Sequence, residues 1–164
     1  MLYAIIAAAV IALDQYFKHW IVTNISYGTD MALLPGIVHL TNVKNTGAAF
    51  SLLSDSTLIL IVITIVFIIG LIVYLVMAKL SVQSRICVAA VIGGAIGNLV
   101  DRLRLGYVVD MFEVEFIHYA IFNVADCFIV IGVILFCVFY IFSEIKAEKK
   151  LKTQIDGEKD EGED

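Results

Sequence analysis

Two aspartates stand in positions where a carboxylate is unusual. Asp110 lies within the apolar stretch 108–112 (VVDMF), and Asp126 follows 16 residues later. The segment between them is short enough to fold back and bring the two carboxylates together. Carboxylates about 3 Å apart share one proton, so one can act as general base on a water while the other acts as general acid. This pairing predicts hydrolysis of a peptide bond.

Asp126 also has a purely structural interpretation. Asn123 is the type of residue that caps a helix, and Asp126, three residues later, is placed to complete a capping box. The helix dipole favours an anion in the first turn as well. From the residues alone, capping and catalysis are both open for Asp126.

Further polar residues interrupt segments that are otherwise apolar. Asp14 and Lys18 are spaced i, i+4 with the acid first, the favourable order for a pair on one helix face. The pair is either an internal salt bridge that lowers the cost of inserting charge into lipid or a support for the backbone of the site. Both interpretations are kept.

The segment 93–102 (GGAIGNLVDR) carries two different faces at helical spacing. Gly93 and Gly97 form a face that allows close approach of another helix. Gly94, Asn98 and Asp101 form a polar stripe on another face. A buried amide without partners costs about 1–3 kcal/mol, so we expect the stripe to find polar partners inside the protein.

The elements that must position these residues are membrane helices. The chain has 164 residues, of which 61% are hydrophobic and 16% charged, with a mean hydropathy of +0.96. Residues 58–78 contain no charge and could cross about 30 Å of hydrocarbon as a helix. These values exclude a soluble enzyme, a disordered chain and a small disulfide scaffold. Four apolar segments, at 2–22, 58–78, 86–100 and 123–142, predict four transmembrane helices.

The connections between these segments suggest one membrane domain over residues 1–142, followed by a charged and partly disordered tail over 143–164, expected as a solvated helix that frays into disorder. Two long connections, about 23–57 and 101–121, lie on one side, and 106–110 has the composition of a short strand. Seven basic residues in the N-terminus, the 79–85 loop and the tail, against three in the long connections, place both termini in the cytoplasm. The long connections, and with them the two aspartates, are then extracytoplasmic.

Four blocks of this sequence together resemble the bacterial lipoprotein signal peptidases, or signal peptidase II. The blocks are 14–18 (DQYFK), 45–51 (NTGAAFS), 93–102 continuing to 106–110 (GYVVD), and 122–126 (FNVAD). Their order and spacing match that family across residues 2–142. Two positions depart from its usual pattern, because Lys44 stands where the family has arginine and Cys127 where it has serine.

The resemblance implies an aspartic endopeptidase of the bacterial cytoplasmic membrane. Its substrates would be diacylglyceryl-modified prolipoproteins, cut just before the lipidated cysteine, with Asp110 and Asp126 as the catalytic pair. It implies binding or supporting roles for eleven further residues, with Asp101 and Arg102 forming structural hydrogen bonds and an ion pair. The eleven are Asp14, Lys18, Lys44, Asn45, Gly47, Gly94, Asn98, Asp101, Arg102, Asn123 and Ala125.

The resemblance also implies a fold and a set of partners. We expect a membrane all-α, four-transmembrane-helix bundle with a small extracytoplasmic β-sheet and a short interfacial helix in the 23–57 connection. Membrane phospholipid and the family inhibitor globomycin are expected partners, and the chain is expected to act as a monomer. No metal or other cofactor is expected, because His19, His39 and His118 are scattered, and no basic stripe predicts nucleic-acid binding.

A different class of function is a small proton-coupled transporter, in which membrane carboxylates relay protons. Such a protein would place an acid near the midplane of a helix and show inverted-repeat symmetry. Only Asp14 lies inside an expected helix, and the two helix pairs show no likeness in sequence. The peptidase is therefore the preferred hypothesis and the transporter the alternative; a purely structural membrane scaffold is a third.

Overall fold

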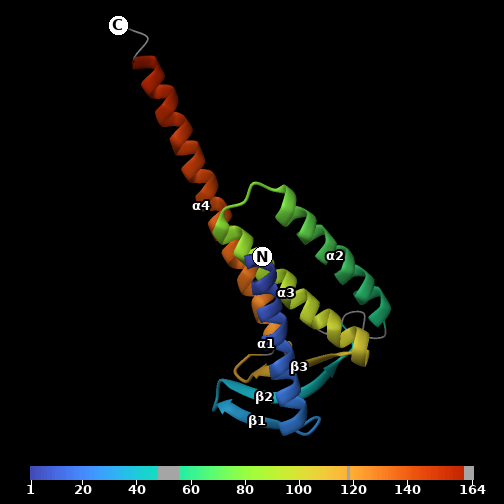
Figure 1. The fold of residues 1–164 in the computed structure, drawn as a ribbon. Helices are drawn as coiled ribbons and strands as arrows, with labels where there is room; N and C mark the ends of the chain where they lie inside the picture. The colour runs from blue at the N-terminus through green and yellow to red at the C-terminus, as the bar shows by residue number, and fades with distance from the viewer. Residues whose placement is uncertain (48–55, 118, 161–164) are drawn as a thin grey trace.

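Four long helices dominate the computed structural model, which describes residues 1–47, 56–117 and 119–160. In this described part, four helices are long and apolar enough to cross a membrane (Figure 1). They are α1 (Leu2–Asn24), α2 (Thr57–Met77), α3 (Val82–Leu105) and the Val124–Glu148 portion of α4 (Val124–Asp160). The prediction of four transmembrane helices is confirmed.

The ends of two helices differ from those that apolar composition predicts. α3 extends beyond 86–100 at both ends, from the N-cap Ser81, whose side chain accepts from the Ser84 amide, to Gly106 in the left-handed region at φ 82°. α4 continues through the charged tail as far as Asp160. Lysine and glutamate are good helix formers, so the helix does not stop where the apolar residues stop.

α3 is the most buried of the four helices and packs against α1, α2 and α4. Its glycines make this possible. A Cβ on Gly93 would lie 2.8 Å from the Ala7 carbonyl oxygen, and one on Gly94 would lie 2.6 Å from the Ala125 carbonyl oxygen. The close-packing face predicted from Gly93 and Gly97 is therefore turned toward α1, whereas Gly94 admits the first turn of α4.

Gly94→Ala is expected to destabilise the protein and to lower its activity. The new methyl group would meet backbone, which cannot rotate away, so we expect a loss of about 1–3 kcal/mol in the free energy of unfolding. Activity would fall because Ala125 directly precedes Asp126. Thermal unfolding in detergent measures the first effect. Gly70→Ala is the matched control, since a Cβ there has nothing within 4 Å; equal stability of the two variants would contradict the packing argument.

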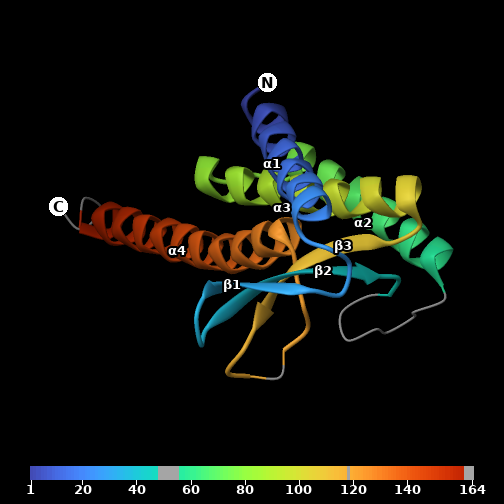
Figure 2. The same ribbon diagram turned by 90° about the horizontal axis from the view of Figure 1, so that it is seen from below.

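A three-stranded antiparallel sheet lies at the end of the bundle where α1 and α3 finish and α4 begins (Figures 1 and 2). Its strands are β1 (Asp30–Leu34), β2 (Val38–Asn45) and β3 (Val108–Val114), in the order β1-β2-β3. The expected small sheet is thus confirmed, and the strand predicted at 106–110 is the start of β3. The described residues of the 23–57 connection contain no short helix, and the rest of that connection, 48–55, lies outside the described residues.

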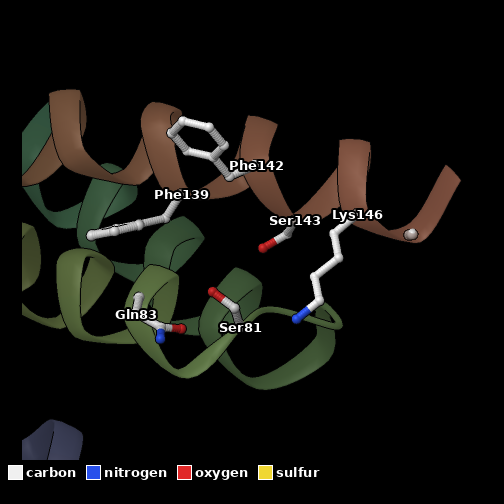
Figure 3. A pocket seen from close by; sticks show the side chains of 7 residues that line it. Ser81, Gln83, Phe139, Phe142, Ser143 and Lys146 are labelled. Atoms are coloured by element: carbon white, nitrogen blue, oxygen red, sulfur yellow. The ribbon is translucent and has the colours of Figure 1, made fainter. Parts of the chain in front are cut away.

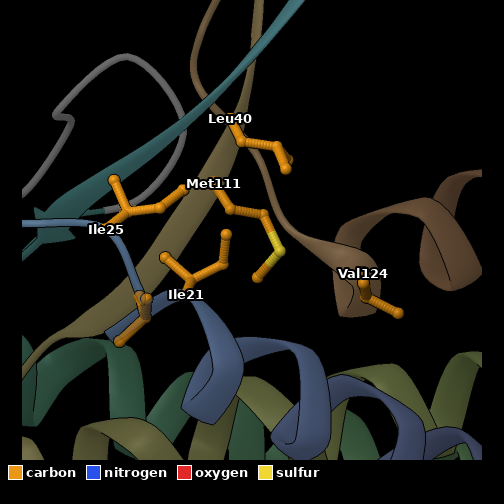
Figure 4. Packing of buried hydrophobic residues seen from close by; sticks show 6 residues of the cluster. Ile21, Ile25, Leu40, Met111 and Val124 are labelled. Atoms are coloured by element: carbon orange, nitrogen blue, oxygen red, sulfur yellow. The ribbon is translucent and has the colours of Figure 1, made fainter. Parts of the chain in front are cut away.

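An apolar cluster joins the sheet to the bundle. It contains Ile21 and Ile25 from the end of α1, Leu40 from β2, Met111 from β3 and Val124 from α4, together with Val109 (Figure 4). Met111 is completely buried. Because Val109 and Met111 flank Asp110, this packing fixes the position of the carboxylate on β3.

Candidate active site

Asp110 is buried beneath the sheet, with only 2% of its surface exposed. Two side-chain amides donate to it: Asn45 Nδ2 to Oδ2 at 2.8 Å, and Asn123 Nδ2 to Oδ1 at 2.6 Å. The two amides come from the end of β2 and the start of α4. The carboxylate therefore connects the sheet to the helix that carries the second aspartate.

Asp126 lies in the first turn of α4 and completes the predicted capping box. Its Oδ2 accepts from the Asn123 amide at 3.1 Å, while its own amide donates to Asn123 Oδ1 at 3.0 Å. Its other oxygen, Oδ1, accepts from Asn98 Nδ2 at 2.8 Å. The capping interpretation is therefore correct, and it leaves a carboxylate oxygen facing the polar stripe of α3.

Both aspartates line one cavity of about 210 Å³. Asn123 binds both of them, Asp110 through its side chain and Asp126 through its backbone amide. The cavity has room for several water molecules at about 30 Å³ each. Four of the expected supporting residues line it as well: Asn45, Asn98, Arg102 and Asn123.

The proton affinity of Asp110 is unusual for an aspartate. Burial raises its pKa from 3.8 to about 6, because removal from water disfavours the charged form. The hydrogen bonds from Asn45 and Asn123 oppose this shift, and the nearby Asp126 adds to it. A carboxyl group with a pKa near neutral, next to a second carboxylate, is suited to acid–base chemistry.

A buried network on α1 and α3 lies behind the cavity, centred on Lys18. Its ammonium is 2.9 Å from Asp14, 3.0 Å from Asp101 and 2.8 Å from the side-chain oxygen of Asn98. Lys18 and Asp14 are 3% and 0% exposed. The Asp14–Lys18 salt bridge expected from the i, i+4 spacing is therefore present, and Asp101 forms a second salt bridge with the same ammonium.

The same network holds the backbone next to both aspartates. Asp14 Oδ1 accepts from the amide of Ala125 at 2.9 Å, and Asp101 Oδ2 accepts from the amide of Val109 at 3.2 Å. These amides belong to the residues that immediately precede Asp126 and Asp110. The two interpretations of Asp14 and Lys18 are consequently both correct, since the salt bridge also supports the site.

Arg102 and Asp101 do not pair as expected. The ion pair of Asp101 is with Lys18, whereas Arg102 donates to the Gly47 carbonyl at 3.0 Å. The two side chains diverge because they are adjacent on a helix, so one faces α1 and the other the cavity. Arg102 Nε is buried and has no hydrogen-bond partner among the described residues.

Gln15 belongs to the site although the sequence did not single it out. Its amide nitrogen donates to Asp101 Oδ1 at 2.9 Å and to the Gly97 carbonyl at 3.2 Å. A glutamine next to Asp14 has no distinctive spacing, so only the three-dimensional fit of α1 against α3 reveals this role. Gly47 is buried, and its amide donates to Asn45 Oδ1 at 2.9 Å, which orients the Asn45 side chain.

Other parts of the described structure are weaker candidates for a catalytic site. No group of three or more histidine, cysteine or acidic side chains suited to a metal occurs in the described part of the chain. His39 contacts Asp30 and Glu115 on the sheet, and His118 lies outside the described residues. A larger cavity of about 530 Å³ lies between α4 and the start of α3, where Figure 3 shows Ser81, Ser143 and Lys146. It contains no carboxylate, so it does not compete as a site of acid–base hydrolysis.

Comparisons with known proteins indicate the family of this chain. Residues 6–142 match the family model described as Signal peptidase (SPase) II. The chain is 43% identical over 155 residues to the lipoprotein signal peptidase of Enterococcus faecalis (strain ATCC 700802 / V583), covering 93% of this chain and 94% of that one. It is 46% identical over 127 residues to that of Streptococcus pyogenes serotype M5 (strain Manfredo), covering 76% and 83%.

Two solved structures share the fold. A bacterial membrane enzyme determined by the in meso method at 2.3 Å resolution has a TM-score of 0.80 and 29% identity, and the match covers 91% of this chain and 90% of that one. A second, at 1.9 Å, has a TM-score of 0.77 and 30% identity, covering 84% and 90%. The four spans and these neighbours make the chain a multi-pass bacterial membrane protein.

Proposed function

This chain belongs to the signal peptidase II family, and we propose from this that it removes signal peptides from prolipoproteins with Asp110 and Asp126 as its catalytic carboxylates. Family membership supports the reaction class. The observation that supports the residue assignment is the shared cavity, in which Asn123 binds both carboxylates. The proton-coupled transporter has no support from either comparison.

The geometry suggests a division of labour within the pair. One ionised carboxylate takes a proton from the attacking water, and its protonated neighbour donates to the carbonyl oxygen of the scissile bond. The resulting tetrahedral intermediate then collapses: the C–N bond breaks, the leaving amine takes the proton that was removed from water, and the proton on the former carbonyl oxygen returns to the carboxylate that donated it. Arg102 lines the same cavity, and its guanidinium is proposed to bind a substrate carbonyl there.

The proposal includes a substrate form and a location. A diacylglyceryl group on the cysteine after the scissile bond would hold that bond at the membrane boundary, which is where the sheet meets the helices. The excess of basic residues in the termini and the short loop supports cytoplasmic termini and an extracytoplasmic site. Activity as a monomer surrounded by phospholipid is part of the proposal.

The direct test uses purified protein in detergent with a diacylglyceryl-modified lipobox peptide. We expect cleavage at the bond before the lipidated cysteine, identified by product mass, and inhibition by globomycin. An unlipidated peptide of the same sequence is the control for the role of the lipid. Folded protein that leaves the lipidated peptide intact, or cuts it elsewhere, would contradict the proposal.

The pH dependence follows from the raised pKa of Asp110. Below about pH 6 Asp110 holds a proton, and above this pH its carboxyl group ionises and can no longer donate one, so kcat/KM is expected to fall as pH rises through this range. Asn45→Ala removes a donor that stabilises the ionised form, which raises the pKa of Asp110 further. The alkaline limb of the kcat/KM profile should therefore move to higher pH, even though the maximal rate falls. A limb that stays in place or moves to lower pH would show that Asn45 does not tune Asp110.

A further inference from the structure

Lys44 lies between two tyrosine rings at the edge of the site. Its ammonium nitrogen is 5.0 Å from the ring centroid of Tyr27 and 5.0 Å from that of Tyr107. Both distances are within the range of cation–π attraction. Lys44 is exposed, and among the described residues no carboxylate lies within ion-pair distance of it. The two rings are therefore the groups in the described structure that attract its ammonium.

These three residues come from three different segments. Tyr27 follows α1, Lys44 is the penultimate residue of β2, and Tyr107 lies between α3 and β3. The contacts therefore tie the end of β2 to both of the segments that enter the sheet from the bundle. Lys44 does not line the cavity that contains the two aspartates.

Fixing Lys44 also fixes its neighbour. Lys44 pairs with Val109 across the sheet, and Asn45 pairs with Val108. Successive side chains on a strand point to opposite faces. When Lys44 is held on one face of the sheet, the Asn45 side chain is therefore held on the other face, where Asp110 lies. That amide donates to Asp110 at 2.8 Å, and beyond Asn45 the β2 strand ends.

We propose that Tyr27, Lys44 and Tyr107 form a clamp whose function is to hold the Asn45 side chain on Asp110. The clamp rests on the proposed function, in which Asp110 is catalytic, and adds positioning residues to it. Lysine suits this place because its compact ammonium is accessible to a ring on either side, and arginine can make the same kind of contact. The clamp thus gives a physical role to Lys44, which stands where the family usually has arginine.

The charged groups that face Asp110 do not belong to the clamp. They are Asp126 on α4, Lys18 on α1 and Arg102 on α3. A change at Lys44 can reach Asp110 either through Asn45 or through the loss of its own positive charge. Variants that separate these two routes are therefore needed.

The experiment compares Lys44→Met, Lys44→Arg, Tyr107→Leu, Asn45→Ala and the double variant Lys44→Met/Asn45→Ala. The titration of Asp110 is followed by NMR of ¹³C-labelled aspartate in micelles, assigned by the signal lost in Asp110→Asn, and kcat/KM is measured across pH. We expect Lys44→Met and the charge-preserving Tyr107→Leu to shift the titration of Asp110 to higher pH. Lys44→Met, which loses both ring contacts, should also reduce kcat/KM about 5- to 30-fold. Lys44→Arg should resemble the wild type, and Lys44→Met should add no shift once Asn45 is alanine.

Three results would overturn the clamp. The first is a shift by Lys44→Met that persists in the Asn45→Ala background, which would indicate direct electrostatics. The second is a normal titration in Tyr107→Leu. The third is lowered thermal stability in Lys44→Met with an unchanged titration, which would indicate a merely structural role. Because the titration does not require turnover, a wild-type protein that failed to cleave would count against the proposed function and leave the clamp measurable.

Discussion

Asp110→Asn or Asp126→Asn is expected to reduce kcat/KM for the lipidated peptide by about 10²–10⁴-fold, the contribution typical of acid–base groups. Asparagine keeps the size of the side chain but can neither take a proton from water nor deliver one to the substrate. In Asp126→Asn the amide oxygen can still accept from the Asn123 backbone, so the start of α4 should persist. Product formation by mass spectrometry and thermal unfolding in the same detergent are the measurements.

The matched control is Asp30→Asn. Asp30 is a half-exposed carboxylate on β1, outside the cavity, whose contact is with His39. We expect its kcat/KM to remain within about twofold of the wild type, as for other surface changes. Near-normal cleavage by folded Asp110→Asn or Asp126→Asn would remove the assignment of the catalytic pair, whatever the family.

Lys18→Met is expected to have the largest effect on stability. Removing the ammonium leaves Asp14 and Asp101 buried without a cation, a change that costs about 3–5 kcal/mol in the free energy of unfolding. Unfolding by increasing denaturant in mixed micelles provides the measurement.

Lys79→Met is the corresponding control, since Lys79 is exposed in the short connection between α2 and α3. It should unfold like the wild type. If Lys18→Met were as stable as the wild type but inactive, Lys18 would have to act on the reaction directly, and the supporting role inferred from its three contacts would be wrong.

Much of this arrangement could be predicted from the sequence because lipid penalises polar groups so strongly. The uncharged run 58–78 could only be a membrane span, Asp14 and Lys18 had the spacing of a pair, and the stripe of Asn98 and Asp101 had to find polar partners inside the protein. Helical spacing then placed Asn98 and Asp101 on one stripe. These expectations depend on local periodicity and on the cost of burial, which are both properties of the sequence.

The remaining contacts depend on how separate elements fit. Whether Asp101 pairs with the adjacent Arg102 or with Lys18 is decided by the rotation of α1 against α3, which local spacing does not determine. The roles of Gln15 and of the tyrosines around Lys44 depend on the same fit. A charged helix beyond the last membrane span could be predicted from the sequence, but the end of α4 at Asp160 could not, because apolar composition marks where a membrane ends and says little about where a helix does.

The Lys18 network also bears on how the protein responds to bilayers of different thickness. A helix bundle meets a thicker or thinner hydrocarbon layer by tilting. Since a single ammonium joins Asp14 to Asp101, and these hold the amides beside Asp126 and Asp110, a tilt of α1 with α3 carries both carboxylates as one rigid body. Acyl-chain length then changes the depth at which the pair meets its substrate, while the spacing within the pair stays constant.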